Sequence, residues 1–305
     1  MNPKNVALVL SSGGARGLAH IGAIEALLEY GYTITSIAGT SMGSLVGAIY
    51  ANSALPGFKD FLTGLNKMDV LRLMDLAVSK KGIIKGERVF GEIKQFIGER
   101  TIEELPIPFT AIATDLFNHR EVIFRHGKLL NALRASAAIP TVLMPQQLEQ
   151  SVLVDGAIVN PLPINRVERQ QGDILIAVNV NAPRENVIRQ ASSPEKKSYN
   201  SILSYVNKKW NGMLAGHETD GGQKHGFFDI VTGSFEMMQY KLTESALKQQ
   251  QVDLLINLPV NLADMFEFYK AKELIKTGYD ATVKQLTEIE ANKAKIQEIV
   301  EEWYI

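Results

Sequence analysis

The sequence predicts an α/β fold built around a mainly parallel central sheet, and three observations support this. Short, continuous apolar runs, typical of strands covered on both faces, alternate with segments whose apolar residues recur at helical spacing. Glycine-rich turns follow the first two apolar runs, at residues 11–17 and 39–43. The composition, 46% hydrophobic and 21% charged, is that of a globular protein with a sizeable core.

The first hundred residues predict two strand-turn-helix units followed by a helical region. Gly31 provides a helix stop, and the small residues around Gly47 let a buried helix lie close to the sheet. The expected elements are a strand at 6–10, a helix at 18–28, a strand at 33–38, a helix at 45–51, and amphipathic helices over 56–100 interrupted by a basic link at 80–85.

The rest of the chain continues the alternation and then becomes helical. Pro140 ends one helix, and Asn118 joins two strands. The expected elements are strands at 108–114 and 121–124, a helix at 129–138, strands at 152–154, 174–180 and 253–258, and a charged helical part from residue 263 onward.

Residues 186–226 are rich in Ser, Lys, Gly and Asn and show no core periodicity, so we interpret them as a surface excursion or lid. The predicted organisation is therefore one α/β domain over residues 1–260, which contains this excursion, and a helical C-terminal extension over 261–305 packed on it.

Charge and composition exclude several classes of protein. The net charge of −1 argues against a nucleic-acid partner, and the absence of Cys excludes disulfides and thiolate metal sites. The apolar run at 6–10 is too short for a signal peptide, and no run approaches the ~20 residues of a membrane span. We expect a cytoplasmic protein whose contact with a membrane is at most peripheral. The carboxylates lack the spacing of a calcium loop, and we expect no metal or cofactor.

The second glycine-rich turn, Gly39-Thr40-Ser41-Met42-Gly43, has the G-x-S-x-G pattern between a strand and a helix. In that setting, small flanking residues such as Gly39 and Gly43 allow a strained bend that exposes a serine hydroxyl as a nucleophile. The simpler interpretation is a serine that only caps the helix.

The first turn, Ser11-Ser12-Gly13-Gly14-Ala15-Arg16-Gly17, places flexible backbone at the start of a helix. Its N–H groups can converge on a developing negative charge, and the helix dipole favours that charge. Arg16 either anchors this loop or attracts an anionic head group.

A dinucleotide site is the competing interpretation. It requires Asp or Glu at the end of the second strand, where this chain has Gly39-Thr40. No G-K-[ST] follows the first turn, which excludes a P-loop.

A serine nucleophile needs a base. A Ser-Asp-His esterase of the α/β-hydrolase type would need His217 or His225, which lie in the polar excursion, a poor platform for a rigid base. Asp155, at the end of the apolar run 152–154, is better placed, although Asp155-Gly156 is also a common turn dipeptide.

The motifs Gly13-Gly14-Ala15-Arg16-Gly17, Gly39-Thr40-Ser41-Met42-Gly43 and Asp155-Gly156-Ala157, in this order, resemble those of the patatin-like phospholipase family, especially its compact bacterial members. The resemblance covers residues 5–182, with a looser match over 253–281.

The resemblance implies a three-layer α/β/α fold and hydrolysis of ester bonds in phospholipids or related lipids through an acyl-enzyme intermediate. It implies a Ser-Asp dyad, with Ser41 as nucleophile and Asp155 as base. It also implies an oxyanion hole from the backbone N–H groups of Gly13, Gly14, Ala15 and Arg16.

One departure from the family pattern is Ser12, which stands where the family usually has glycine. If that position needs a positive φ, Ser12 would strain the loop. The alternative is then a catalytically weak scaffold that binds lipid or protein.

Two segments are candidates for contact with lipid. Residues 198–214 combine aromatic and basic residues as an interfacial anchor or lid would, or they pack on their own domain. A group of apolar residues forms either an acyl pocket or ordinary helix cores: Phe58, Phe61, Leu62, Met68, Leu71, Leu73 and Met74.

Overall fold

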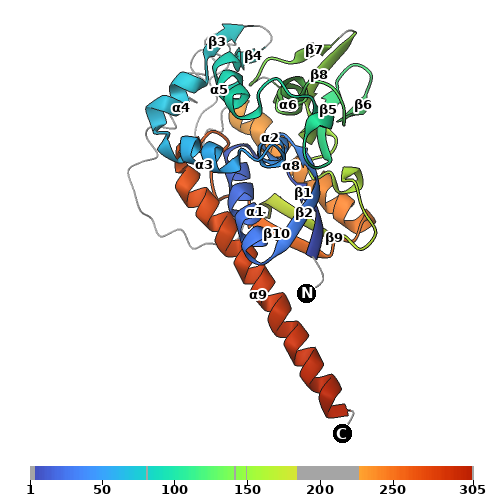
Figure 1. Cartoon of the computed structure of the whole chain (residues 1–305). Coiled ribbons are helices and arrows are strands. Elements are labelled where there is room, and N and C mark those ends of the chain that lie inside the picture. The colour runs from blue at the N-terminus through green and yellow to red at the C-terminus, as the bar shows by residue number, and fades with distance from the viewer. Residues whose placement is uncertain (1–3, 80–81, 141, 149, 184–226, 304–305) are drawn as a thin grey trace, which may run out of the picture. The chain divides into compact units, whose positions relative to one another are not determined.

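The computed structural model describes residues 4–79, 82–140, 142–148, 150–183 and 227–303 (Figure 1). The chain divides into two compact units, residues 1–184 with 239–305, and residues 185–238. The first unit contains an eight-stranded sheet in the order β10-β9-β1-β2-β5-β8-β7, with β6 paired to β5. Its strands are β1 (Lys4–Leu10), β2 (Tyr32–Thr40), β5 (Phe109–Asp115), β6 (Arg120–Phe124), β7 (Gln146–Leu148), β8 (Ser151–Asp155), β9 (Ile174–Ala182) and β10 (Leu254–Pro259).

The strands from β10 to β5 are parallel, and β6, β7 and β8 run antiparallel to their neighbours. The predicted mainly parallel sheet is therefore confirmed. Strand β1 shows why its sequence is apolar throughout. Val6, Leu8 and Leu10 pack into one buried cluster, whereas Ala7 and Val9 pack into another. Successive side chains of a strand point to opposite faces, so both faces of this sheet are covered.

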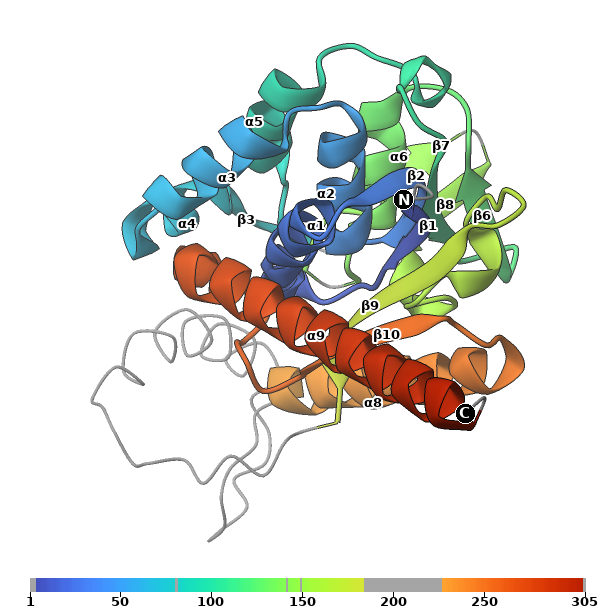
Figure 2. The same cartoon turned by 60° about the horizontal axis from the view of Figure 1, so that its bottom comes forward.

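Most helices cover one face of the sheet, and Figure 2 shows α9 lying along α1, the helix it contacts most. The helices contributing to the cluster on this face, or lying beside it, are α1 (Ala19–Glu29), α2 (Met42–Ala51), α3 (Leu55–Gly64), α4 (Lys67–Leu73), α5 (Glu87–Ile97), α6 (Leu129–Ser136) and α9 (Ala271–Trp303). Residues 162–167 and the end of α8 (Phe227–Gln249), through Ala246 and Leu247, cover the other face. The result is the expected three-layer α/β/α arrangement.

The structure differs from the predicted elements at four places, the largest being helix α8, which no predicted element covers. Within the region predicted to be helical over 56–100, β3 (Leu76–Ser79) pairs with β4 (Gly82–Ile84), and the short edge strand β7 was not predicted. These strands are too short for an alternating pattern to be recognised. Helix α9 begins at Ala271 rather than near residue 263, because residues 261–270 form a turn with its own hydrogen bonds.

The predicted excursion at 186–226 and the candidate anchor at 198–214 lie outside the described residues. None of the helices in the part of the chain that the structure describes is long and apolar enough to span a membrane.

Candidate active site

Ser41 lies in a sharp turn between β2 and α2, with φ 56° and ψ −123°. A non-glycine residue in this region of φ/ψ space is strained and needs a surrounding structure that enforces it. The backbones around it pack closely. A Cβ on Gly39 would lie 2.5 Å from the carbonyl of Gly43, and one on Gly43 would collide with the carbonyl of Leu10. Both glycines of the G-x-S-x-G pattern are therefore needed to form this turn.

The Ser41 hydroxyl donates a hydrogen bond to Asp155, with 2.6 Å between Oγ and Oδ2. Sheet register brings the two together, because Thr40 pairs with Ile112 on β5 and Asp155 pairs with the next residue of β5, Ala113. Both side chains are buried, with exposed fractions of 4% and 1%. Two residues predicted from separate motifs thus form one buried pair.

Further hydrogen bonds hold both the side chain and the backbone of Asp155. Its Oδ1 accepts a hydrogen bond from the Ala157 N–H at 2.8 Å, and Thr114 Oγ1 donates to its backbone carbonyl at 2.9 Å. Burial raises the pKa of Asp155 to about 7, against the lowering effect of the hydrogen bonds from Ser41 and Ala157. A carboxylate with a pKa near neutrality can accept and return a proton.

The backbone around Ser41 favours negative charge. The Ser41 N–H donates to Ser136 Oγ at 2.9 Å, which fixes the turn. Helix α2 begins at Met42, whose N–H has no acceptor within the helix, as is usual in the first turn. The positive end of the α2 dipole therefore lies beside the Ser41 hydroxyl.

In the predicted oxyanion loop, some backbone N–H groups donate hydrogen bonds within the protein and others do not. Ala15 N–H donates to the Met265 carbonyl at 2.9 Å, and Arg16 N–H donates to the Gly13 carbonyl at 3.2 Å. The Gly13 and Gly14 N–H groups are absent from the hydrogen bonds of the described residues, and Gly14 lines the same cavity as Ser41. Of the four predicted residues, Gly13 and Gly14 are the ones whose amides can face a new anion.

Gly14 is needed at its position, because its φ is +55° and a Cβ there would lie 2.8 Å from the Met265 carbonyl oxygen. Ser12, in contrast, is not among the described residues with positive φ. Its Oγ donates to Gln239 Oε1 at 3.1 Å, and its N–H donates to the Pro161 carbonyl at 2.9 Å. The strain that a positive φ would cause at Ser12 is therefore not present, and two hydrogen bonds hold this serine in place.

The Arg16 side chain anchors the loop. It is 2% exposed, its Nη1 donates to the Ala263 carbonyl at 3.2 Å, and its Nη2 donates to Asn181 Oδ1 at 3.1 Å. Such a buried guanidinium does not face solvent, where a lipid head group would approach. Of the two interpretations of Arg16, the structure supports the anchor.

No described histidine is hydrogen-bonded to Ser41 or Asp155. His20 is buried on α1 with Nε2 2.9 Å from the Ser11 carbonyl, and burial lowers its pKa to about 4, so it is neutral and supports the loop. His119 and His126 are exposed, whereas His217 and His225 lie outside the described residues. Among the described residues, no group of three or more His, Cys, Asp or Glu can hold a metal ion.

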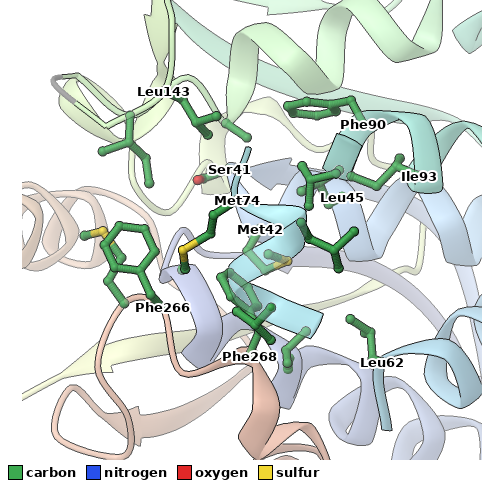
Figure 3. Close-up of a pocket in the computed structure, with 18 of the residues that line it drawn as sticks. Ser41, Met42, Leu45, Leu62, Met74, Phe90, Ile93, Leu143, Phe266 and Phe268 are labelled. Carbon is green, nitrogen blue, oxygen red and sulfur yellow. The ribbon is translucent and has the colours of Figure 1, made fainter. Parts of the chain in front are cut away.

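A strongly apolar cavity opens from Ser41 between α2, α3, α4, α5 and the turn before α9, and Figure 3 shows the Ser41 hydroxyl among the apolar side chains of this cavity. Of the residues proposed for an acyl pocket, those that line it are Phe58, Phe61, Leu62, Leu73 and Met74. Leu71 is not among the lining residues, and Met68 points away, with 57% of its surface exposed. A cavity of this kind accepts a hydrocarbon chain.

Several residues that support the site were not singled out from the sequence. Ser136 lies within the span 5–182 that resembles the family, but nothing in the sequence assigns it to the Ser41 N–H. Asn181 follows the apolar run of β9, and a polar residue at the end of a buried strand is a usable signal. Gln239, and Met265 through its carbonyl, carry no local signal, because their roles depend on long-range contacts.

Comparisons with known proteins identify the family and several similar proteins. The family model described as patatin-like phospholipase matches residues 8–167. An uncharacterized NTE family protein of Mycobacterium bovis is 33% identical, over 90% of this chain and 89% of its own. Lysophospholipase NTE1 of Pyricularia oryzae is 32% identical, over 69% of this chain and 14% of its own. The crystal structure of VipD from Legionella pneumophila is similar over 94% of this chain and 67% of its own, with a TM-score of 0.48 and 15% identity.

The class that the fold and the family model define is that of an α/β lipid ester hydrolase. The chain belongs to the patatin-like phospholipase family.

Proposed function

We propose that this protein is a serine acyl hydrolase that cleaves lipid esters with a Ser41–Asp155 dyad. The observation that carries the proposal is the 2.6 Å hydrogen bond from Ser41 Oγ to Asp155 Oδ2 beside an apolar cavity. Ser41 Oγ attacks the ester carbonyl as its proton passes to Asp155. The carbonyl oxygen becomes an oxyanion, which the Gly13 and Gly14 N–H groups and the N-terminus of α2 stabilise.

The second half of the reaction returns the proton. Collapse of the tetrahedral intermediate expels the alcohol, which takes the proton from Asp155 and leaves an acyl ester on Ser41. Water then attacks this ester while Asp155 accepts its proton, and the fatty acid departs as the proton returns to Ser41 Oγ. Each step uses the same carboxylate, for which a pKa near 7 suits both roles.

The cavity supports an acyl ester of a lipid as substrate. Its lining is apolar apart from backbone and the Ser41 hydroxyl, so it fits the hydrocarbon chain, while the polar part of the lipid stays outside. Contact with a membrane would then be peripheral, at the mouth of this cavity, in a cytoplasmic protein that needs no cofactor.

A lipid panel tests the function. We expect the purified protein to release fatty acid from phospholipids or lysophospholipids, as measured by mass spectrometry. We also expect an alkyl fluorophosphonate, which reacts with activated serines, to add one label to each chain at Ser41. A protein that releases no fatty acid from any lipid and takes no label would refute the proposal.

The pH dependence follows from the pKa of Asp155. Because the base must be ionised, kcat/KM should rise about tenfold per pH unit below neutrality and level off above about pH 7. The same group should make folding less favourable as pH rises from about 4 to 7, because the buried acid is more stable protonated. Rates with a soluble ester between pH 5 and 9 measure the predicted dependence of kcat/KM on pH. A kcat/KM that is flat from pH 5 to 7 would contradict the assignment of Asp155 as the base.

A further inference from the structure

One short stretch of chain contacts both functional parts of the site. Residues 261–268, between β10 and α9 and called the 261–268 segment below, place the side chains of Met265, Phe266 and Phe268 in the wall of the apolar cavity. In Figure 3, Phe266 and Phe268 lie on this wall together with Met74. The same segment supplies the Met265 carbonyl, which binds the Ala15 N–H of the oxyanion loop at 2.9 Å.

The oxyanion loop is fastened to this segment by a buried polar network. Arg16 joins the Ala263 carbonyl to Asn181 Oδ1, and Asn181 Nδ2 donates to the Ser12 carbonyl at 2.7 Å. Arg16, Asn181 and Ser12 are all nearly inaccessible to solvent. Buried charge-assisted hydrogen bonds of this kind fix geometry, because breaking one leaves a costly unpaired group.

The segment is also held from its other end. Glu267, 8% exposed, accepts hydrogen bonds from the Asp264 N–H at 3.0 Å, from the Tyr269 hydroxyl at 2.8 Å and from Lys270 Nζ at 2.8 Å. Burial raises the pKa of Glu267, but these bonds outweigh it and lower the pKa overall, so the carboxylate stays ionised near neutral pH. Glu267 does not line the cavity, so its contribution is to the shape of the segment.

We propose that the 261–268 segment sets the oxyanion loop and the acyl wall together, and that Arg16 is a positioning residue whose loss lowers turnover most for long acyl chains. The proposal rests on the proposed hydrolase function. A short acyl group needs only the oxyanion loop. A long chain also lies against Met265, Phe266 and Phe268. Displacing the segment therefore disturbs both the oxyanion loop and the wall that a long chain contacts.

The test compares p-nitrophenyl acetate with p-nitrophenyl decanoate. In Arg16→Met we expect kcat to fall about tenfold with acetate and about 100-fold with decanoate, since a misplacement of about 1 Å costs rates of this order. Arg16→Lys should recover part of the decanoate rate. Glu267→Gln loosens the segment from its other end, and we expect a loss of about fivefold with decanoate and less than about twofold with acetate.

Two variants at residues that neither line the cavity nor bond the oxyanion loop serve as matched controls. Arg169 lies before β9 at the opposite end of the strands from Ser41, and Glu244 forms exposed ion pairs on α8. Arg169→Met and Glu244→Gln should leave both rates within about twofold. Circular dichroism identifies the folded variants. If Arg16→Met does not fold, Arg16→Lys and Glu267→Gln decide the question.

A change in the decanoate-to-acetate ratio distinguishes positioning from partial unfolding. A smaller folded fraction lowers every rate equally and leaves that ratio unchanged. An unchanged ratio in the folded Arg16 variants or in Glu267→Gln overturns this inference while leaving the hydrolase function intact. Wild-type rates in Ser41→Ala would instead overturn the hydrolase function itself.

Discussion

Ser41→Ala is expected to reduce ester hydrolysis by a factor on the order of 10⁴ or more, because Ser41 is the proposed nucleophile and no other described serine is hydrogen-bonded to Asp155 through its hydroxyl. The substitution removes one oxygen from a buried position and leaves Asp155 Oδ2 without its donor, at a cost of about 1–3 kcal/mol of stability. The protonated form of Asp155 limits this cost, so the variant should remain folded. Initial rates with a soluble p-nitrophenyl ester and with a phospholipid measure the loss.

Ser245 on α8 offers a control, because it is an exposed serine far along the chain from the turn. Ser245→Ala should hydrolyse both substrates at the wild-type rate. Equal rates for Ser41→Ala and wild type would remove Ser41 from the reaction, and the scaffold interpretation would take its place.

Asp155→Asn is expected to lower kcat by about 10³- to 10⁴-fold, with KM nearly unchanged, because an amide cannot accept the serine proton. The amide retains the shape of the side chain, and its oxygen can still accept the hydrogen bond from the Ala157 N–H. The rise of kcat/KM toward pH 7 should disappear with the carboxylate. Rate profiles of both proteins over the same pH range provide the measurement, and thermal unfolding monitors the fold.

His217 and His225 supply the comparison for the base, since a Ser-Asp-His triad would need one of them. His217→Ala and His225→Ala should retain activity within about threefold. Loss of several orders of magnitude in either variant, with substantial activity in Asp155→Asn, would assign the base to histidine.

Much of the fold could be predicted because its strands are buried on both faces. Residues 6–10 are apolar throughout and residues 174–180 are apolar apart from Asn179, since each strand contributes to two cores. The strands β3, β4 and β7 are short, and their pairing partners lie nearby in the chain, so neither length nor periodicity reveals them. The late start of α9 has another cause. The 261–268 segment is held by Arg16 and by the Ala15 N–H, contacts that are remote in sequence.

The candidate dyad could be predicted because each residue sits in a local motif, and strand order then brings the motifs together. Ser41 follows β2 and Asp155 ends β8, while β5 lies between these strands and aligns them. The motifs could not show which backbone N–H groups of the oxyanion loop are free and which already donate hydrogen bonds within the protein. Ala15 and Arg16 lie in the same motif as Gly13 and Gly14, and only the position of the Met265 carbonyl and the turn at Gly13 show that their N–H groups are already bound.

The most direct test is to trap the acyl-enzyme. Rapid-quench mass spectrometry of the wild-type protein mixed with p-nitrophenyl decanoate should show one decanoyl group, on the peptide that contains Ser41. In Asp155→Asn the same adduct should form more slowly, by the factor seen in kcat. Hydrolysis that proceeds without an adduct on Ser41, or an adduct that forms in Asp155→Asn at the wild-type rate, would contradict the Ser41–Asp155 dyad.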